Sequence, residues 1–494
     1  MSLTESQLRA ATTLDRPVAV TAGPGSGKTR VLVARYLGIL ESGNGDIENI
    51  VAITFTKKAA SEMRDRVRKE LEKRAAAAED SKSRTMWRDR RRKLDAAIIT
   101  TIHGFCSRLL REHPVEAGID PQFTTLDTYE ESVLVDAAAH AAVTGAIDDG
   151  SAAVAELVAS YSRPGLVRAI EGVQKSIRSL GLPLDELIAT SERNLGTVDE
   201  WNACVARVDE TVLEALATLA TLPEKPKASL TSKVNAAKQL QAFATAWARL
   251  LKHLEQVGSG EADSEFFELL RRLRPVLPKR SITTRLKPYA EDLHDLVGKT
   301  GLDGALGGAA LDLVARVYLP AISELVRMMG DLYALEKRNR SALDYEDLQL
   351  GALRLLTEHP EVARRARARY RYFLVDEYQD TNGLQRDIVK AFVEGDRPAN
   401  LFIVGDPKQS IYGFRGAEVA VFAETSREIV GGGGDSIALE TNFRSDGRIV
   451  RFVRALFGHN GCVRDRVFQD GATRAKRRDA HRRRTKRVRL RSDS

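Results

Sequence analysis

The sequence predicts an α/β fold in which a parallel, doubly wound sheet is interrupted by a large helical segment. A strand, a glycine-rich loop and a helix follow one another at 18–40. Between 105 and 340, long Ala-, Leu-, Glu- and Arg-rich stretches have helical spacing, with breaks rich in Pro, Gly, Ser and Lys. Further short apolar runs, which we expect to complete the parallel sheet, occur at 50–56, 97–101, 372–375 and 401–404.

The first predicted strand, Val18–Thr21, leads into a loop that is typical of phosphate binding. Glycines let a backbone adopt positive φ and turn its N–H groups toward phosphate oxygens, and a helix N-terminus adds its positive dipole end. Lys28 can reach the β- and γ-phosphates, and the Thr29 hydroxyl can hold Mg²⁺. The alternative is an ordinary Gly/Pro turn between a strand and the amphipathic helix Thr29–Leu40. The loop residues are Ala22, Gly23, Pro24, Gly25, Ser26, Gly27, Lys28 and Thr29, with Ala22 where the strict pattern has Gly.

Two adjacent carboxylates follow the predicted strand Tyr372–Val375. Ligands bind at the carboxyl ends of strands in open α/β sheets. Asp376 is therefore placed to bind Mg²⁺, and Glu377 to orient and deprotonate an attacking water. Taken alone, the segment is equally compatible with two carboxylates exposed at a strand end. Together with Lys28, it indicates a nucleotide-driven enzyme that uses a nucleoside triphosphate with its Mg²⁺.

Composition sets limits on the class of protein. A chain of 494 residues exceeds what one core usually supports, so we expect two or three domains. The three cysteines contain no CxxC pair, which disfavours a disulfide framework or a zinc or iron–sulfur site and fits a reducing cytoplasm. There is no signal-like N-terminus and no run of 18 apolar residues, so no membrane span is expected.

The net charge of +8 conceals an uneven distribution. Residues 471–494 hold 11 Lys or Arg and two Asp, so the other 470 residues sum to −1. Any electrostatic path for nucleic acid must therefore be a local stripe. We expect the basic tail, 458–494, to be disordered.

Further segments occur in a fixed order around the loop and the carboxylates, over about residues 1–455. They are Leu3–Gln7, Ile53–Met63, Thr100–Cys106, Val404–Ala417 and Leu439–Ser445. This order resembles that of superfamily 1 DNA helicases of the UvrD/Rep group. It resembles most the branch that contains the AddA and RecB helicase–nuclease subunits.

The resemblance implies roles around the nucleotide. Gln7 would read the adenine base, which Arg30 and Phe443 would sandwich. Gln409 would contact the γ-phosphate and couple hydrolysis to movement. Arg444 would be an arginine finger, a fixed cation where charge develops in phosphoryl transfer.

The resemblance also implies contacts with DNA from Phe55, Thr56, His103, Tyr412 and Phe414. Rings that stack on bases bind DNA without sequence preference. Other interpretations remain open at this point. Tyr412 and Phe414 could be core aromatics, His103 a structural histidine, and Thr56 only a helix cap.

The implied domain organisation has four parts. A RecA-like P-loop motor domain, 1A, would comprise 1–104 and 341–435, and a helical domain, 1B, would be inserted at 105–340. Residues 436–457, opening with the strand Ser436–Leu439, would begin an incomplete second motor domain, 2A. The basic tail, 458–494, would follow.

Motifs V and VI of the family, and the C-terminal nuclease of this branch, have no counterpart in the sequence. We therefore interpret the chain as an N-terminal portion of an ATP-dependent 3′–5′ DNA helicase or translocase of recombinational repair. Its partners would be single-stranded DNA or duplex ends and a second helicase–nuclease subunit, in the cytoplasm and with the nucleoid when on DNA. One alternative is an ATP- and ssDNA-binding fragment without motor activity. A weaker one is a P-loop ATPase that acts on another polymer or protein.

Overall fold

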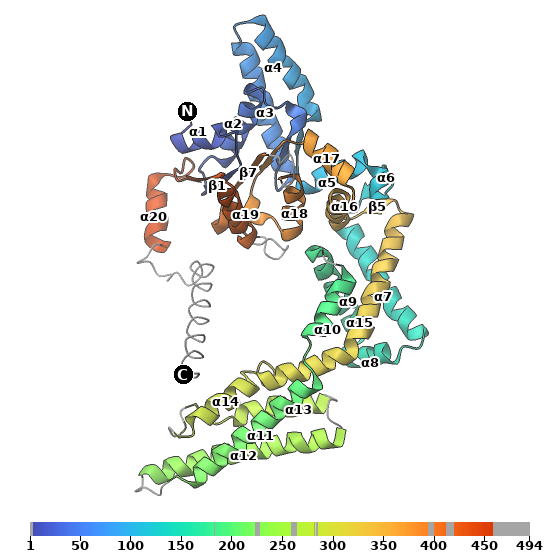
Figure 1. Cartoon of the computed structure of the whole chain (residues 1–494), viewed down its shortest axis with the longest axis vertical. Helices are drawn as coiled ribbons and strands as arrows, with labels where there is room; N and C mark the ends of the chain where they lie inside the picture. The colour runs from blue at the N-terminus through green and yellow to red at the C-terminus, as the bar shows by residue number, and fades with distance from the viewer. Residues whose placement is uncertain are drawn as a thin grey trace, which may run out of the picture. The chain divides into compact units, whose positions relative to one another are not determined.

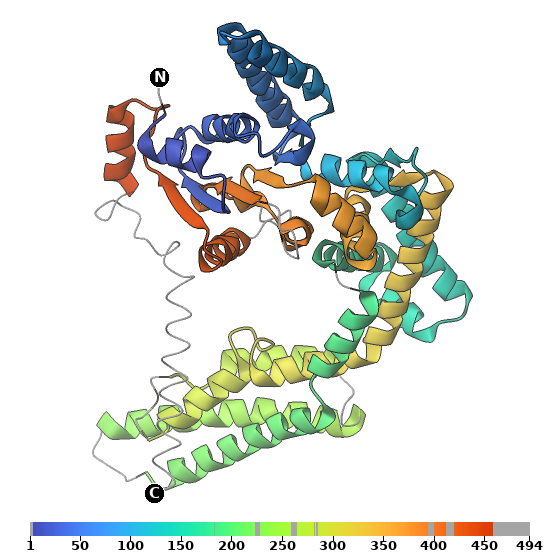
Figure 2. The ribbon, with the colours of Figure 1, turned by 45° about the horizontal axis from the view of Figure 1, so that its top comes forward.

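The computed structural model describes residues 3–181, 183–222, 228–257, 264–280, 282, 285–393, 400–411 and 419–457 (Figures 1 and 2). The chain divides into two compact units. The α/β unit comprises Met1–Gly118 and Gly351–Ser494, and the helical unit comprises Ile119–Leu350. The helical unit begins and ends later than the predicted insert at 105–340. The predicted tail, 458–494, lies outside the described residues.

Six strands form the sheet of the α/β unit, in the order β3–β2–β6–β7–β1–β8. Every neighbouring pair is parallel. The central strands are almost continuously buried, as a sheet covered on both faces requires. The strands are β1 (Val18–Ala22), β2 (Ile50–Ile53), β3 (Ile98–Thr100), β6 (Tyr372–Val375), β7 (Asn400–Gly405) and β8 (Asp435–Leu439).

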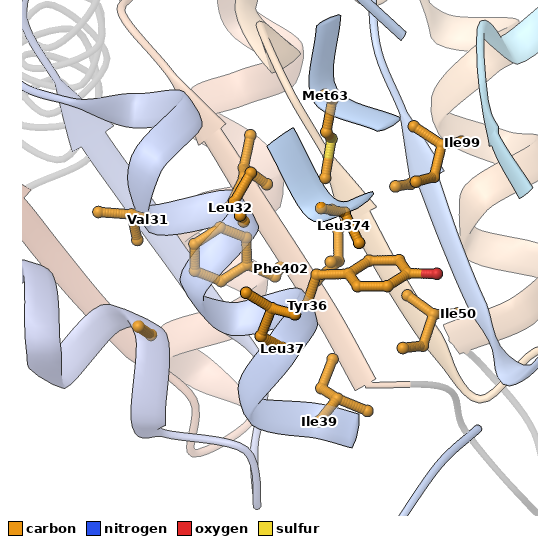
Figure 3. Close-up of a cluster of buried hydrophobic side chains, with 14 of the residues drawn as sticks. Val31, Leu32, Tyr36, Leu37, Ile39, Ile50, Met63, Ile99, Leu374 and Phe402 are labelled. Carbon is orange, nitrogen blue, oxygen red and sulfur yellow. The ribbon is translucent and has the colours of Figure 1, made fainter. Parts of the chain in front are cut away.

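Three helices cover one face of this sheet: α1 (Glu5–Thr12), α2 (Lys28–Glu41) and α3 (Lys57–Ala77). Figure 3 shows the Tyr36 ring of α2 next to the strand residues Leu374 and Ile50, with Met63 of α3 beyond Leu374. Tyr36 is fully buried. The helix that carries the phosphate-binding loop is thereby fixed against the sheet.

Aromatic side chains form the core on the other face. Phe105 of α5 (Ile102–Glu112) contacts Tyr370, Phe373 and Phe392 with ring centroids 5.6, 5.7 and 5.6 Å apart. Phe392 belongs to α18 (Gly383–Val393), and Phe373 is the strand residue next to Leu374. Because successive strand residues point to opposite faces, α5 and α18 pack on the side away from α2. The chain is therefore an α/β protein with a parallel sheet covered on both faces.

The strand expected to open a second motor domain, Ser436–Leu439, belongs instead to the sheet of the α/β unit. It forms most of β8, which pairs with β1 from Val18↔Asp435 to Ala22↔Leu439. The pairing gives the backbone groups of β1 partners on the side away from β7. Ile437 and Leu439 join the same core as α2.

The helical unit contains two cores along one long helix, α15 (Ala305–Asn339). Leu306 and Leu313 lie in one core, and Leu325 and Met329 lie in the other. By length and apolar composition alone, α15 could cross a membrane. Its buried face instead packs against its neighbours, which include α7 (Thr128–Asp148), α9 (Arg163–Leu180), α11 (Val198–Ala220) and α14 (Lys287–Val297).

A buried ion network joins the end of α15 to α9. Asp344, fully buried, accepts hydrogen bonds from Arg178 at 2.7 and 2.8 Å, from Lys337 at 2.9 Å and from the Tyr333 hydroxyl at 2.8 Å. Asp347 accepts from Arg178 at 2.8 Å and from Lys337 at 2.5 Å. Burial raises the pKa of Asp344, but Arg178 and Lys337 outweigh it and hold that pKa below its ordinary value. Two carboxylates thus neutralise two buried cations.

We predict that Asp344→Asn destabilises the helical unit by about 3–5 kcal/mol, because it leaves two buried cations with one carboxylate. Urea denaturation near neutral pH measures this. Asp185→Asn is the control, since Asp185 pairs with Arg327 while 83% exposed, and should change stability by no more than about 1 kcal/mol. Equal effects of the two substitutions would contradict a structural role for the network.

Candidate nucleotide-binding site

The loop between β1 and α2 has the backbone geometry of an anion cradle. Gly25 and Gly27 have φ of +72° and +85°, in the left-handed region. Gly27 is the N-cap of α2 and supplies no side-chain cap. Within the described residues, no acceptor takes the N–H groups of Lys28 or Thr29. Free N–H groups at a helix N-terminus suit a phosphate, so the loop fits the ligand that its sequence predicts.

Gln7 is fixed against this loop. Its Nε2 donates to the Ser26 carbonyl at 2.8 Å, and its Oε1 accepts from the Thr4 N–H at 3.1 Å. A Cβ at Gly27 would lie 2.8 Å from Gln7 Nε2 and would displace that side chain, and the φ of +85° independently favours glycine there. Gln7 is 2% exposed. The structure therefore brings the predicted adenine-reading residue to the loop, which its position in the sequence alone does not guarantee.

Lys28 and Glu377 form an ion pair although 349 positions separate them. The Lys28 Nζ lies 2.6 Å from Glu377 Oε2. Glu377 has φ of +49°, a conformation that costs a non-glycine residue energy. The Glu377 N–H donates to Asp376 Oδ1 at 3.0 Å, and Asp376 N–H donates to the Ile53 carbonyl at 2.9 Å. The loop and the acidic strand end therefore meet at one place.

Asp376 is partly buried and forms no ion pair with a cation among the described residues. Burial and the neighbouring charge of Glu377 raise its pKa to about 7, and Lys28 opposes the rise. Mg²⁺ prefers oxygen ligands and commonly takes only one or two carboxylates beside phosphate oxygens. The carboxylate of Asp376 and the hydroxyl of Thr29, at the second position of α2, are such ligands. No group of three or more His, Cys, Asp or Glu side chains suited to a metal occurs among the described residues. The residues present fit Mg²⁺ held jointly with a nucleotide.

A second strand end joins the site through Gln379, which is 2% exposed. Its Nε2 donates to Glu377 Oε2 at 3.0 Å, and its Oε1 accepts the Asp406 N–H at 2.8 Å. Gln409 Nε2 donates to Asp406 Oδ2 at 2.5 Å. A chain of polar contacts therefore runs from Lys28 to Gln409. Sequence reasoning missed Gln379 and Asp406, although both follow neighbouring parallel strands.

Asp380 adds a third carboxyl group near Lys28. Gln379 Nε2 donates to its Oδ2 at 3.2 Å, and its Oδ1 is buried without a partner among the described residues. Burial and the charge of Glu377 raise the pKa of Asp380. The site therefore concentrates more negative charge than Lys28 can neutralise, and a bound cation would relieve it.

The turn after β8 lies directly on the loop. The Phe443 N–H donates to the Gly25 carbonyl at 2.9 Å. Asn442 Oδ1 accepts the N–H groups of Arg444 and Ser445 at 2.8 and 3.0 Å. A Cβ at Gly25 would lie 2.6 Å from Arg444 Cβ. Arg444 and Phe443 are thus brought to the nucleotide loop, and Asn442, which the sequence did not single out, fixes the turn that holds them.

The structure describes three of the five residues that are predicted to contact DNA. Thr56 is the N-cap of α3, since its Oγ1 accepts the Ala59 N–H at 3.0 Å. Burial, followed by the charge of Lys57, lowers the pKa of His103 to about 4. Phe55 and Thr56 follow β2 and His103 follows β3, so these three start from the strand edge that carries the loop. Their roles stay predictions. Tyr412 and Phe414 lie outside the described residues.

The raised pKa of Asp376 makes stability depend on pH. The native state holds this proton more tightly than the unfolded chain, whose ordinary value is 3.8. That contribution is complete below about pH 4 and is lost as pH rises through about 7. We expect Asp376→Asn to be more stable than the parent at about pH 8, by on the order of 2–4 kcal/mol, with little difference near pH 4.

Urea unfolding of both proteins at several pH values, without nucleotide or Mg²⁺, measures the difference. Asp89→Asn is the matched control, because Asp89 is an exposed residue of α4 (Ser81–Lys93). Its substitution should leave the pH dependence unchanged. A stability gain of Asp376→Asn that is the same at all pH values would contradict the raised pKa.

Comparisons with known proteins show the family to which the chain belongs. The family of UvrD/REP helicase N-terminal domains matches residues 3–429. An ATP-dependent helicase/nuclease subunit of Levilactobacillus brevis is 29% identical, over 92% of this chain and 38% of its own length. The proteins of that name from Syntrophomonas wolfei and Listeria monocytogenes (strain F2365) are 28% and 29% identical, over 89% and 92% of this chain and 36% and 39% of their own lengths. The chain thus spans less than two fifths of these relatives. The resemblance to the UvrD/Rep group and its helicase–nuclease branch is confirmed, and the chain belongs to the UvrD/REP helicase N-terminal domain family.

Proposed function

We propose that this chain is the N-terminal part of an ATP-dependent DNA helicase or translocase that moves 3′–5′ on single-stranded DNA in repair and recombination. The observation that carries the proposal is the 2.6 Å contact between Lys28 and Glu377 beside the partly buried Asp376, whose pKa is raised. A phosphate-binding lysine, a candidate base and a candidate magnesium ligand are thereby gathered at one strand edge. Phosphoryl transfer from a nucleoside triphosphate needs this set.

The Lys28–Glu377 pair suggests how the site changes when it is used. Bound ATP with Mg²⁺ supplies the phosphoanhydride and the charge that neutralises the carboxylates. Lys28, drawn to the phosphates, releases Glu377, which then orients the attacking water and accepts its proton. Asp376 and Thr29 hold the cation. Gln379 keeps the Glu377 side chain near its resting position while Lys28 leaves.

The remaining assignments follow the same geometry. Gln7, Arg30 and Phe443 bind the adenine end, while Ala22, Gly23, Pro24, Gly25, Ser26 and Gly27 wrap the phosphates. Arg444 neutralises charge that develops in the transition state, and Gln409 senses the γ-phosphate. The bond between Phe443 N–H and the Gly25 carbonyl supports this, because it fixes the arginine-bearing turn on the loop.

DNA is the polymer we propose for this motor, with contacts from Phe55, Thr56, His103, Tyr412 and Phe414. Binding would be salt-dependent and largely independent of sequence. The α/β unit would be a RecA-like motor domain with the helical unit inserted as domain 1B. The relatives are named as subunits, which supports the proposal that the partner, in the cytoplasm, is a second helicase–nuclease subunit.

A non-motor fragment that binds ATP and ssDNA is the second candidate. The pairing of β8 with β1, in the sheet of the α/β unit, favours this candidate. The strand that was expected to open a second motor domain, Ser436–Leu439, thus extends the sheet of the α/β unit. Translocation needs two domains that close on ATP and open after hydrolysis.

ATP binding and turnover, with and without single-stranded DNA, distinguish these candidates. Turnover stimulated by DNA supports the motor, and binding without turnover supports the fragment. We predict that Lys28→Ala weakens ATP binding at least about tenfold and abolishes turnover, because it removes the phosphate-binding cation. Glu377→Gln should keep ATP bound but unhydrolysed.

Lys390→Ala is the matched control for these substitutions. Lys390 pairs with Glu428 at 2.8 Å on the surface of the α/β unit, and its loss should alter neither ATP affinity nor turnover. Near-parental ATP binding by Lys28→Ala, or near-parental turnover by Glu377→Gln, would remove the assignment of the site.

A further inference from the structure

The helix pair α3–α4 concentrates positive charge. Residues 57–93 contain 15 Lys or Arg and seven Asp or Glu. The rest of 1–470 carries 50 Lys or Arg and 59 Asp or Glu. An excess of eight positive charges thus resides in one helical hairpin on an otherwise acidic body. The nucleotide chemistry of the α/β unit does not call for it.

The hairpin projects from the edge of the sheet opposite to the nucleotide loop. α3 begins directly after Thr56, at the carboxyl end of β2. Its 21 residues extend about 31 Å, whereas the four residues of β2 span about 13 Å. Arg74 pairs with Glu41, the last residue of α2, and Lys93 pairs with Asp46, before β2. The second half of α3 and all of α4 therefore extend beyond the strand starts, as Figures 1 and 2 show.

Packing holds the two helices together. Trp87 of α4 is 8% exposed and belongs to the same core as Leu71 and Ala75 of α3. Arg74 and Arg90 lie over its ring, 5.8 and 4.9 Å from the centroid. Arg91 bridges to Glu72 of α3 at 2.7 Å. The hairpin is thus a defined surface.

Several of its cations are not used within the protein. Lys73, Arg92 and Lys93, among others, pair with nearby carboxylates. Other basic side chains of the hairpin are exposed and form no ion pair with any described residue. They include Arg66, Lys69, Lys82 and Arg88. Their charge faces solvent and is available to an anionic partner.

The composition of the hairpin surface favours nucleic acid over protein. Protein interfaces have an apolar centre and are depleted in Lys. Within 57–93, all of which is described, Met86 is the single large hydrophobic side chain that is exposed, at 38%. Interfaces with nucleic acid are more polar and much more positive. Since Trp87 is buried, the hairpin offers no exposed ring on which unpaired bases could stack.

We propose that the α3–α4 hairpin binds the phosphate backbone of duplex DNA. The surface is separate from the candidate contacts at Phe55, Thr56 and His103, which start from the opposite strand edge. Binding there requires neither ATP nor a particular sequence, because it depends on exposed charge alone. The hairpin therefore gives the chain a second DNA contact, on a duplex, beyond the proposed single-stranded path.

The test compares the full chain with the triple variant Lys69→Gln, Lys82→Gln and Arg88→Gln. Affinity for a short blunt duplex of mixed sequence is measured by fluorescence anisotropy over a range of salt concentrations. We expect at least about tenfold weaker binding at moderate salt and a log–log salt slope reduced by about 2–3, since each lost phosphate contact lowers it by about 0.9. The control removes equal charge from exposed residues of the helical unit, with Arg193→Gln, Arg271→Gln and Lys299→Gln.

Each outcome of this test supports or contradicts duplex binding by the α3–α4 hairpin. Duplex affinity that falls equally in both triple variants shows a net-charge effect and overturns the proposal, as does unchanged affinity in the hairpin variant. A loss confined to single-stranded DNA overturns the duplex assignment. Weakened binding of an acidic polypeptide, with duplex binding intact, assigns the hairpin to a protein partner instead.

Two further measurements separate this proposal from the nucleotide site and from misfolding. The hairpin variant should bind ATP as the parent does, whereas Lys28→Ala should lose ATP binding and retain the duplex contact. Photo-crosslinking of the unaltered chain to the duplex should yield adducts within 66–93, beyond the start of α3 that adjoins Thr56. Adducts confined to other segments overturn the proposal even if the variant fails to fold.

Discussion

Parallel pairing of β1 with β7 and β8, and of β6 with β2, is the constraint on which the rest of the structure depends. Parallel strands place all their carboxyl ends at one edge, so whatever follows each strand is gathered there. Lys28 and Glu377 meet for this reason across 349 positions. The pairing of β2 with β6 also makes neighbours of two strands that lie on either side of the helical unit in the sequence. The helical unit, Ile119–Leu350, can therefore be long without changing the register of the strands.

Because the strand ends gather several carboxylates at one place, the site is electrostatically unfavourable until a cation binds. Asp376, Glu377 and Asp380 lie near one another, and Lys28 forms an ion pair with Glu377. Burial raises the pKa of Asp376 and Asp380 because desolvation disfavours their charged forms. Glu377 additionally holds a positive φ. Without a cation, the repulsion and desolvation of these carboxylates destabilise the folded protein. A cation that binds between them removes this cost, and the free energy recovered adds to its affinity.

Sequence patterns predicted the parts of the structure that depend on local chemistry. The glycine loop, the strand at Tyr372–Val375 and the Thr56 cap follow from residue types at fixed spacing. The sequence did not predict that Ser436–Leu439 pairs with β1, because strand pairing is not local and the sequence of Asp435–Leu439 does not specify a neighbour. Gln379 and Asn442 were missed because their roles depend on backbone groups that only the fold brings into reach. The projection of α3–α4 likewise depends on helix length compared with strand length.

The distribution of charge suggests why the hairpin lies where it does. If Lys82 and Arg88 stood at the nucleotide edge, they would pair with Asp376 or Glu377 and compete with both Lys28 and a bound cation. They lie instead beside the second half of α3: Trp87, next to Arg88, packs with Leu71, which lies 14 residues, or about 21 Å, along α3 from its first residue, Lys57. The Debye length at physiological ionic strength is about 8 Å. The two sites are therefore electrostatically independent. One α/β unit can hold an acidic site that needs a cation and a basic surface that needs an anion, provided that the sheet separates them.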